Sequence, residues 1–411
     1  MCCKLTHITV CGREKEKVTR DSMSLMPDSD DELEPVEAPM AVIDCFCGLG
    51  GCSVGFAQEG FSLEVAVDNE RVALSQLGGN AGVGRQVLRC VTLKTDGDWT
   101  AEADLPPARA GLHFHASAPC TEMATAKRKK DAVSLAAGLA LFRTAIETPL
   151  LRGDATWTSE QVPNKAAVEL VEAFEAKFPR RVSHVVLDAS DIGCPSSRRR
   201  LIVGDPLTIQ NLKQEPTSRV SIAQAFAAYG VSPKAGTDSL GVMRGPSGCA
   251  KRRTLADVAP CVTASHPLTF FDAQNQSLGC LTPAHSAALM GFPKTWSLPR
   301  KQRAAQCAVG NAIPVALSAA MARAAKAAIQ SQATGVATPI SKEALTAIKP
   351  TTPPTPVSEQ GDEAIALADE LNALASRALH LAKKLRQMPH AAAESSSSPE
   401  PTSSEQTTGS L

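Results

Sequence analysis

The chain has 411 residues, which is too long for one ordinary domain and predicts about two. Its 43% hydrophobic content allows a sizeable core, and its formal net charge of zero excludes a uniformly basic nucleic-acid coat. Its 13 cysteines include no CxxC pair, which favours a reducing compartment over a disulfide framework or a zinc ribbon. A secretory signal core and an uninterrupted apolar run of roughly 18 residues are both missing from the sequence, so we expect an intracellular protein, nuclear in a eukaryote and otherwise cytoplasmic, without a membrane partner or a bound metal.

The first half of the chain alternates short apolar runs with helical stretches. Residues 1–38 are an exception, because they are acidic, lack apolar periodicity and predict a disordered arm. Within residues 39–204 we expect strands at 41–44, 63–68, 112–117, 155–158, 184–187 and 201–204, and helices at 133–147 and 165–177. This alternation predicts an α/β fold with a Rossmann-like, mostly parallel sheet that carries helices on both faces.

The pattern loosens after residue 204. We expect a small irregular lobe at 205–279 with one helix at 221–229. The segment 280–331 is expected to return to the first domain, with helices at 282–290 and 314–329. After it we expect a Thr/Pro linker at 332–360, an amphipathic helix at 361–389 and a disordered Ser/Thr tail at 390–411. Residues 364–388 carry a heptad seam of about three and a half repeats. Self-association, a partner helix and docking on the chain's own first domain are all compatible with this seam.

A cluster of glycines follows the first predicted strand, and its members with the preceding aromatic are Phe46, Gly48, Gly50 and Gly51. The second strand ends at Asp68, which is 17 residues after Gly51 and is followed by Asn69. An acid near this spacing commonly binds a ribose hydroxyl in doubly wound folds. Because the glycines do not form GxGxxG, we expect an adenosine-containing cofactor without a pyrophosphate. A turn that serves only packing is the alternative.

Three later segments bring reactive side chains to one edge of the predicted sheet. Cys120 follows Pro119 just past a strand, at the edge where ligands bind in open parallel sheets, and cysteine is readily activated as a nucleophile. Glu160 follows the next predicted strand, and Arg198 and Arg200 stand beside the last one. Singly these are an ordinary buried thiol, a helix N-terminal acid and a solvated charge cluster. Together they predict a site with a thiol, a carboxylate and guanidinium groups.

In their order along the chain, these segments resemble the C5-cytosine methyltransferase family. The match covers about residues 40–328 and rests on Phe46-Cys47-Gly48-Leu49-Gly50-Gly51, Pro119-Cys120, Glu160-Gln161-Val162, Ser196-Ser197-Arg198-Arg199-Arg200, Leu281-Thr282-Pro283, Gly291-Phe292-Pro293 and Gly310-Asn311.

The resemblance implies a reaction and a set of roles. S-adenosylmethionine would be the cofactor, bound by the glycine loop, Asp68, Asn69 and Asn311. Cys120 would add to C6 of a cytosine flipped out of duplex DNA. Glu160 would hold the N3 and amino edge of the base, while Arg200 and Arg198 would contact O2 or orient the loop. A transfer-RNA substrate and a non-catalytic nucleic-acid-binding homologue are the alternatives.

The sequence departs from the family pattern at several positions. Ala118, Gln161, Ser196 and His285 replace proline, asparagine, glutamine and glutamate, and Arg89-Cys90-Val91 stands where Gly-Asp-Ile is frequent. By the same resemblance, residues 205–279 would be the target-recognition region. Basic runs at 127–130, 251–253 and 300–303 could contact phosphates or be solvated faces, and the first of them could also be a nuclear-import signal.

Overall fold

The computed structural model describes residues 39–80, 85–120, 123, 132–243, 249–331 and 336–348. The predicted arm at 1–38, the basic run at 127–130, the heptad helix at 361–389 and the tail at 390–411 lie outside these ranges.

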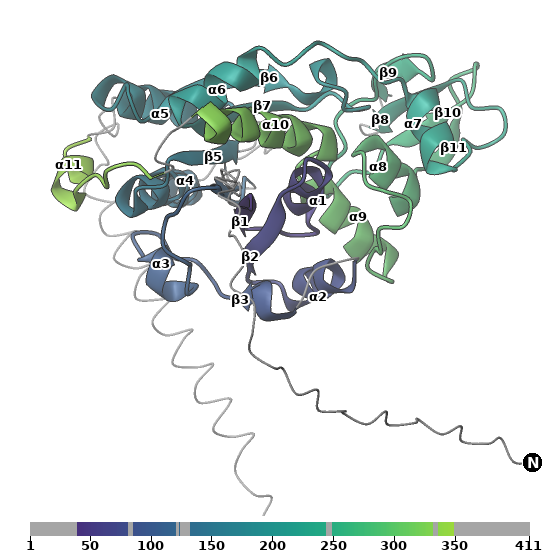
Figure 1. The fold of residues 1–411 in the computed structure, drawn as a ribbon. Helices are drawn as coiled ribbons and strands as arrows, with labels where there is room; N and C mark the ends of the chain where they lie inside the picture. Colours follow the sequence, from purple (N-terminus) through teal and green to yellow (C-terminus); the bar gives the residue numbers. More distant parts are fainter. Residues whose placement is uncertain are drawn as a thin grey trace, which may run out of the picture. The chain divides into compact units, whose positions relative to one another are not determined.

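A seven-stranded sheet forms the centre of the fold, with strand order β3-β2-β1-β4-β5-β7-β6 (Figure 1). The strands are β1 (Ala41–Cys45), β2 (Ser62–Asp68), β3 (Leu88–Cys90), β4 (Leu112–Ala116), β5 (Thr156–Gln161), β6 (Ser183–Asp188) and β7 (Arg199–Gly204). The first five in this list pair in parallel, whereas β7 runs antiparallel to both β5 and β6. The predicted Rossmann-like, mostly parallel sheet is therefore confirmed.

Helices cover both faces of this sheet. One face carries α1 (Gly51–Gln58), α6 (Pro206–Lys213) and α10 (Val315–Ser331), and α10 packs on both of the others. The other face carries α3 (Trp99–Glu102), α4 (Ala132–Arg152) and α5 (Lys165–Lys177), and α2 (Arg71–Gly79) lies against β2 and β3. Short 3₁₀ turns occur at Arg85–Val87 and Ala189–Asp191.

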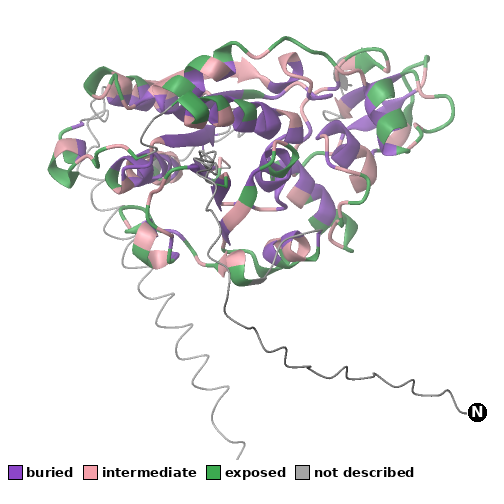
Figure 2. Cartoon of the chain, viewed as in Figure 1, coloured by how far each residue is buried: buried purple, intermediate pink, exposed green. Residues whose placement is uncertain are grey.

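The alternation of side chains along each strand separates two cores. In β1, Val42 packs with α1 and α10, whereas Ile43 packs with Phe114 and Trp157 on the opposite face. Buried residues accordingly line the strands and the inner sides of the helices, and exposed residues cover the outside (Figure 2).

Helix α5 shows why such a segment is helical. Asn164 caps its N-terminus by accepting from the Ala167 N–H, and the buried residues Ala167, Leu170, Val171 and Phe174 follow a helical period.

The segment between the two parts of the large domain contains a second sheet, which the loosened sequence pattern did not predict. Its order is β11-β10-β8-β9, formed by β8 (Ser239–Met243), β9 (Cys249–Thr254), β10 (Thr269–Phe271) and β11 (Ser277–Cys280), and all three pairings are antiparallel. Helices α7 (Ile222–Tyr229), α8 (Pro283–Leu289) and α9 (Gln302–Asn311) complete this part. Its apolar core includes Leu49 of the glycine loop, so the smaller lobe packs directly against the predicted cofactor loop.

The predicted linker is wrong for residues 336–348, which dock on the large domain. Helix α11 (Lys342–Thr346) buries Leu345, and Ile348 is buried just after it, both in the core formed by α4 and α5. Arg143 of α4 donates to the Leu345 and Ile348 carbonyl oxygens at 2.9 and 3.0 Å. Composition alone did not reveal this docking, because only two buried apolar side chains, Leu345 and Ile348, hold this short Thr/Pro-rich segment against the domain.

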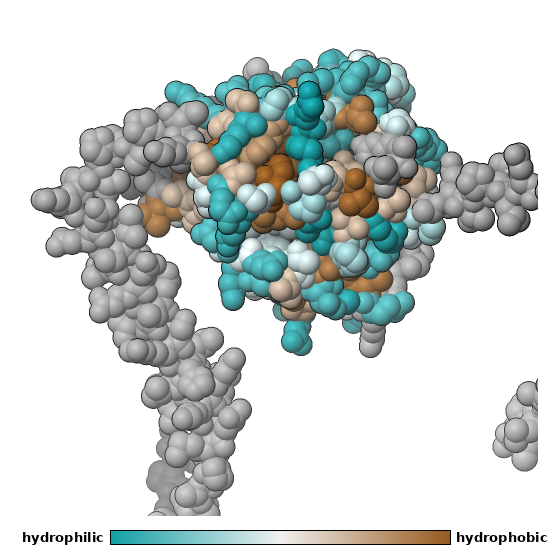
Figure 3. Space-filling view, turned by 60° about the vertical axis from the view of Figure 1, so that its left-hand side comes forward, coloured by the Kyte–Doolittle hydropathy of each residue, from teal (hydrophilic) through white to brown (hydrophobic). Residues whose placement is uncertain are grey.

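The outer surface carries few large apolar side chains. Among the described residues, those exposed are Val72, Val133, Leu151, Leu207 and Val336. One face of the molecule shows apolar areas among hydrophilic side chains (Figure 3). Two helical stretches, Val133–Arg152 and Gln302–Ser331, are long and apolar enough to cross a membrane by length and composition alone. The second has 72% of its most apolar window buried, as expected of a core helix.

Candidate active site

The ends of β4 and β5 and the start of β7 meet at one edge of the large sheet. Because β7 is antiparallel to β5, with Leu201 opposite Gln161, Arg199 and Arg200 begin their strand beside the end of β5. Glu160 lies within β5 and not after it, since the pairing with β7 continues through Gln161. The chain reversal in β7 is thus what carries the arginines to the carboxyl edge of the parallel strands.

The turn that carries Cys120 is tied to its neighbours by several hydrogen bonds. The Ser117 N–H donates to the Cys45 carbonyl at 3.1 Å, and its hydroxyl donates to the Phe46 carbonyl at 3.3 Å. The Gln161 Nε2–H donates to the Ala118 carbonyl at 3.2 Å. Beyond the thiol, the Met123 N–H donates to the Cys120 carbonyl at 3.0 Å. The thiol therefore stands on a turn that is bonded to both β1 and β5.

The charged groups predicted from the sequence surround this thiol. Glu160 and Arg200 form a buried ion pair, and Arg198 is buried and donates from Nη1 to the Val262 carbonyl at 2.8 Å. Burial, and then the Glu160 carboxylate, raise the pKa of Cys120, whereas Arg200 and Arg198 act in the opposite direction. The structure thus brings all four predicted residues together and keeps the unliganded Cys120 mainly as the neutral thiol.

Asp188 braces the arginine segment and was not singled out from the sequence. Its carboxylate accepts from the Ser197 hydroxyl at 2.7 Å and from the Arg198 and Ser190 N–H groups at 2.8 and 3.0 Å. Burial would raise the pKa of Asp188, but these hydrogen bonds together lower it below its usual value. The only sequence signal is an acid at the end of a predicted strand, a position that many acids occupy.

The glycine loop leaves open space at one position and packs closely at two others. Gly48 has φ +51°, and no described atom lies within 4 Å of where a Cβ would stand. By contrast, a Cβ on Gly51 would lie 2.2 Å from the Ile313 carbonyl oxygen, and one on Gly50 would lie 2.6 Å from Leu77. Gly48 is therefore the position where a ligand can approach the backbone, and Gly50 and Gly51 are required by packing. Phe46 adopts φ 62° and contacts Trp99 edge-on at 5.3 Å between ring centroids.

Asp68 holds the glycine loop by accepting backbone hydrogen bonds. One carboxylate oxygen accepts from the Gly48 N–H and the other from the Glu70 N–H, each at 2.8 Å. Glu70 is exposed at the start of α2 and makes no capping hydrogen bond with its side chain. Asn69 is also exposed, and its carbonyl lies 3.8 Å from the Cys90 thiol. Asp68 thus holds the loop in place, while Glu70 has the freer carboxylate.

Asn311 belongs to a segment that meets the glycine loop from the other side. It is exposed at the end of α9, and its amide Nδ2 lies 3.7 Å from the Cys307 thiol. The residues that follow it are buried, and it is Ile313 that packs against Gly51. The late Gly-Asn pair and the early glycine loop, far apart in sequence, therefore lie at one place in the fold.

Comparison with known proteins supports the resemblance. No family model matches the chain. It is 23% identical over 322 residues to the type II methyltransferase M.AplI of Arthrospira platensis, covering 72% of this chain and 88% of that relative. This similarity supports methyltransferase activity for the chain, whose ordered motifs resemble those of the C5-cytosine methyltransferases.

Solved structures with a similar chain path share little sequence with this methyltransferase. One, described as a DNA modification methyltransferase encoded within an E. coli prophage, is 16% identical, with a TM-score of 0.49, and covers 71% of this chain and 99% of that one. The Entamoeba histolytica methyltransferase EhMeth is 16% identical, with a TM-score of 0.47, and covers 70% and 98%. S. pombe Dnmt2 is 16% identical, with a TM-score of 0.44, and covers 68% and 96%.

At two positions where this methyltransferase departs from the family pattern, Ser196 and His285, the side chain contacts neighbouring residues of the fold. Ser196 is buried, with its hydroxyl 3.4 Å from the Cys194 thiol and 3.9 Å from the Met290 sulfur. The ring of His285 lies between Thr282 and the Ser232 carbonyl, at 2.7 and 2.9 Å from its two nitrogens. Both substitutions therefore make contacts that are consistent with packing the smaller lobe.

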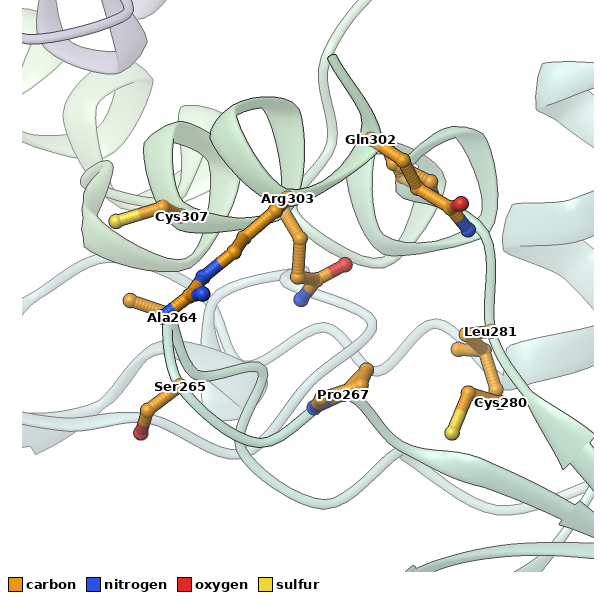
Figure 4. A pocket seen from close by; sticks show the side chains of 10 residues that line it. Ala264, Ser265, Pro267, Cys280, Leu281, Gln302, Arg303 and Cys307 are labelled. Carbon is orange, nitrogen blue, oxygen red and sulfur yellow. The ribbon is translucent and has the colours of Figure 1, made fainter.

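A cavity of about 550 Å³ lies between α9 and the loop before β10 (Figure 4). Its lining includes Arg303, Gln302, Ser265 and the thiols of Cys280 and Cys307, but not Cys120 or the glycine loop. The cavity is therefore separate from the site of the thiol. It borders the same loop whose Val262 carbonyl receives the hydrogen bond from Arg198.

Proposed function

We propose that this methyltransferase transfers a methyl group from S-adenosylmethionine to C5 of a cytosine in duplex DNA, through a covalent bond between Cys120 and C6. The observation that carries the proposal is the convergence of Cys120, the Glu160–Arg200 ion pair and Arg198 at one sheet edge. A thiol, a carboxylate and guanidinium groups are what the ordered family motifs imply for this chemistry.

The residues of the chain suit the successive steps. Cys120 loses its proton and its sulfur bonds to C6, so that the electron pair of the C5–C6 double bond becomes available at C5. Glu160 faces the N3 and amino edge and, with Arg200 and Arg198 close by, stabilises the charge that the addition places on the ring. After C5 has gained the methyl carbon, a proton leaves C5 to solvent, the double bond re-forms and the Cys120 thiolate departs.

The chain also fits the expected cofactor. When bound, S-adenosylmethionine would supply the electrophilic methyl carbon and keep the electron pair of the broken sulfur–carbon bond as a neutral thioether. The open space over Gly48 leaves the backbone accessible to a ligand, and Phe46, Asn69, Glu70 and Asn311 are the groups that we propose to hold the cofactor there. Asp68 would hold the loop in position through the Gly48 N–H.

The proposed nucleic-acid contacts are basic side chains of the smaller lobe. Arg253, Arg300 and Arg303 are exposed or line the cavity, and Arg252 lies over the Phe271 ring at 4.4 Å. Such groups would bind phosphates without reading sequence. The cytosine must leave the base stack to reach Cys120, so we propose that the enzyme flips it. An intracellular location, where DNA is found, is part of the same proposal.

The decisive experiment measures transfer of a tritiated methyl group to long unmethylated DNA and to transfer RNA, side by side, with Cys120→Ser as the matched control. We expect label in DNA cytosine, none with Cys120→Ser, and equal cofactor affinity by calorimetry. Duplex DNA containing 5-fluorocytosine should form a covalent adduct that maps to Cys120, since fluorine cannot leave C5 as a proton does.

Two outcomes would contradict the proposal. Label in transfer RNA alone would show that transfer RNA, and not DNA, is the methyl acceptor. Cofactor binding without label in either nucleic acid would indicate a non-catalytic homologue.

A further inference from the structure

The central strand β4 places two histidines in the core of the large domain. His113 and His115 are both fully buried, on the face opposite Leu112, Phe114 and Ala116. Each ring has one nitrogen 2.9 Å from the Thr158 hydroxyl oxygen on β5. Imidazoles are uncommon at such positions because burial must be balanced by hydrogen bonds or a metal.

Three polar atoms of this group have no hydrogen-bond partner among the described residues. They are Nδ1 of His113, Nε2 of His115 and Oδ1 of Asp44, and all three side chains are completely buried. Asp44 and His115 also belong to one cluster of candidate metal ligands. Oδ2 of Asp44 accepts from the Ser53 hydroxyl at 2.6 Å, so only one carboxylate oxygen is free. An unsatisfied buried nitrogen or oxygen destabilises the folded state, so a cluster of such atoms calls for an occupant that interacts with them.

A thiol completes the cluster. One ligand atom each from Asp44 on β1, Cys52 on α1 and His115 on β4 lies within 4.8 Å of the other two. Dividing that spacing by √3 gives a point no more than about 2.8 Å from all three atoms, against about 2.0–2.3 Å for zinc–ligand bonds. A contraction of at most about 0.5–0.8 Å per ligand therefore brings these side chains to zinc-bond distances.

We propose that Asp44, Cys52 and His115 bind one divalent transition-metal ion of the zinc class. A nitrogen, a carboxylate oxygen and a sulfur form a donor set that zinc accepts readily. Thr158 fits the role of an outer-shell partner. When Nδ1 of His115 donates to it, the lone pair of Nε2 is left available for an ion, as is usual for metal-bound histidine.

The position of this cluster gives the ion a structural role. Cys45 and Gly51, on either side of the cofactor loop, are adjacent to Asp44 and Cys52, and β4 leads directly into the turn of Cys120. The ion would thus join β1, α1 and β4, the three elements that lead into or out of the cofactor loop and the Cys120 turn. The proposal does not depend on the identity of the methyl acceptor, because its tests measure the metal and not the reaction.

Metal content of the full-length protein tests the proposal directly. The protein is produced in medium supplemented with zinc, and bound metal is measured by mass spectrometry after gel filtration. We expect about one ion per chain in the natural protein. We expect loss of most of it in Cys52→Ser and His115→Gln, and retention in Cys194→Ser, which removes an equally buried thiol outside the cluster.

Cobalt gives a second readout, and its first measurement uses the natural protein, so the presence of the site is tested before any variant is made. Protein produced with cobalt in place of zinc should show a thiolate-to-cobalt charge-transfer band, which Cys52→Ser removes and Cys194→Ser keeps. Full-length protein that carries less than about a tenth of an ion per chain and shows no cobalt band would overturn the proposal, and a bridging water would then be the occupant of the cluster.

Discussion

Gln161 donates its side-chain N–H to the Ala118 carbonyl across 3.2 Å, and both residues are departures from the family pattern. The same side chain accepts from the Val162 N–H at 2.8 Å. Gln161 thus links the end of β5 to the residue two positions before Cys120. The nucleophile turn, which here lacks its first proline, is held by a hydrogen bond from β5.

Gln161→Met should lower kcat by roughly 10–100-fold while leaving cofactor affinity unchanged, because the thiol loses its fixed position. Methionine keeps the length of the side chain but cannot donate. The measurement is steady-state methyl transfer with calorimetry of the cofactor. Gln224→Met, which breaks a capping box on α7, is the matched control and should keep kcat. Natural turnover in Gln161→Met would show that the turn needs no brace.

Glu160→Gln should make Cys120 more reactive toward iodoacetamide at neutral pH and yet lower methyl transfer by about 100-fold or more. The Glu160 carboxylate raises the pKa of Cys120 while Arg200 and Arg198 act against it, so its removal lowers that pKa and increases the thiolate fraction. Peptide mass spectrometry gives the alkylation rate, with exposed Cys90 as the internal reference.

The same measurement gives a pH dependence. Since the pKa of Cys120 in the natural protein is raised, its alkylation should accelerate as the pH rises above neutrality. Slower or unchanged alkylation of Cys120 in Glu160→Gln would contradict the assigned electrostatics.

Asp68→Ala should weaken S-adenosylmethionine binding by about 1–3 kcal/mol and also lower the free energy of unfolding, because the Gly48 and Glu70 N–H groups lose their acceptor. Glu70→Ala, at an exposed position, should weaken the cofactor without changing stability by more than about 0.5 kcal/mol. Calorimetry and urea unfolding separate the two effects. If neither variant alters cofactor affinity, the pocket lies elsewhere.

A chain ending at residue 331 should be destabilised by roughly 3–6 kcal/mol, because Leu345 and Ile348 leave the core. A chain ending at residue 350 should unfold at the same urea concentration as the full protein. Leu345→Ala tests the same contact with one side chain and should cost about 2–5 kcal/mol, whereas Leu207→Ala, at an exposed leucine, should cost little. Equal stability of the two shortened chains would show that residues 336–348 contribute nothing.

The heptad seam at 364–388 remains a prediction about association. Light scattering over a concentration series should show self-association of the full chain and its loss in the chain ending at residue 350, with methyl transfer per site retained. A full chain that stays monomeric at every concentration would exclude a self-associating coil and favour a partner helix or docking on the chain itself.

Much of the large sheet was predictable because its signals are local. Buried parallel strands are short apolar runs, so six of the seven were located, and α5 was predicted with its observed bounds. Strand β3 and the whole second sheet were missed. Their strands alternate less clearly and are stabilised by partners distant in sequence, such as Thr269 opposite Gly241.

The sequence by itself determined which groups this protein can use: a thiol after a strand, a carboxylate, a pair of arginines and a glycine loop, in an order shared with one family. Only the tertiary structure decided what they contact. The reversal of β7 brings Arg200 to Glu160, Asp68 uses both oxygens on backbone N–H groups, and His115 meets Asp44 and Cys52. The physical reason is that burial and pairing depend on strand order and direction, which no local pattern of residues contains.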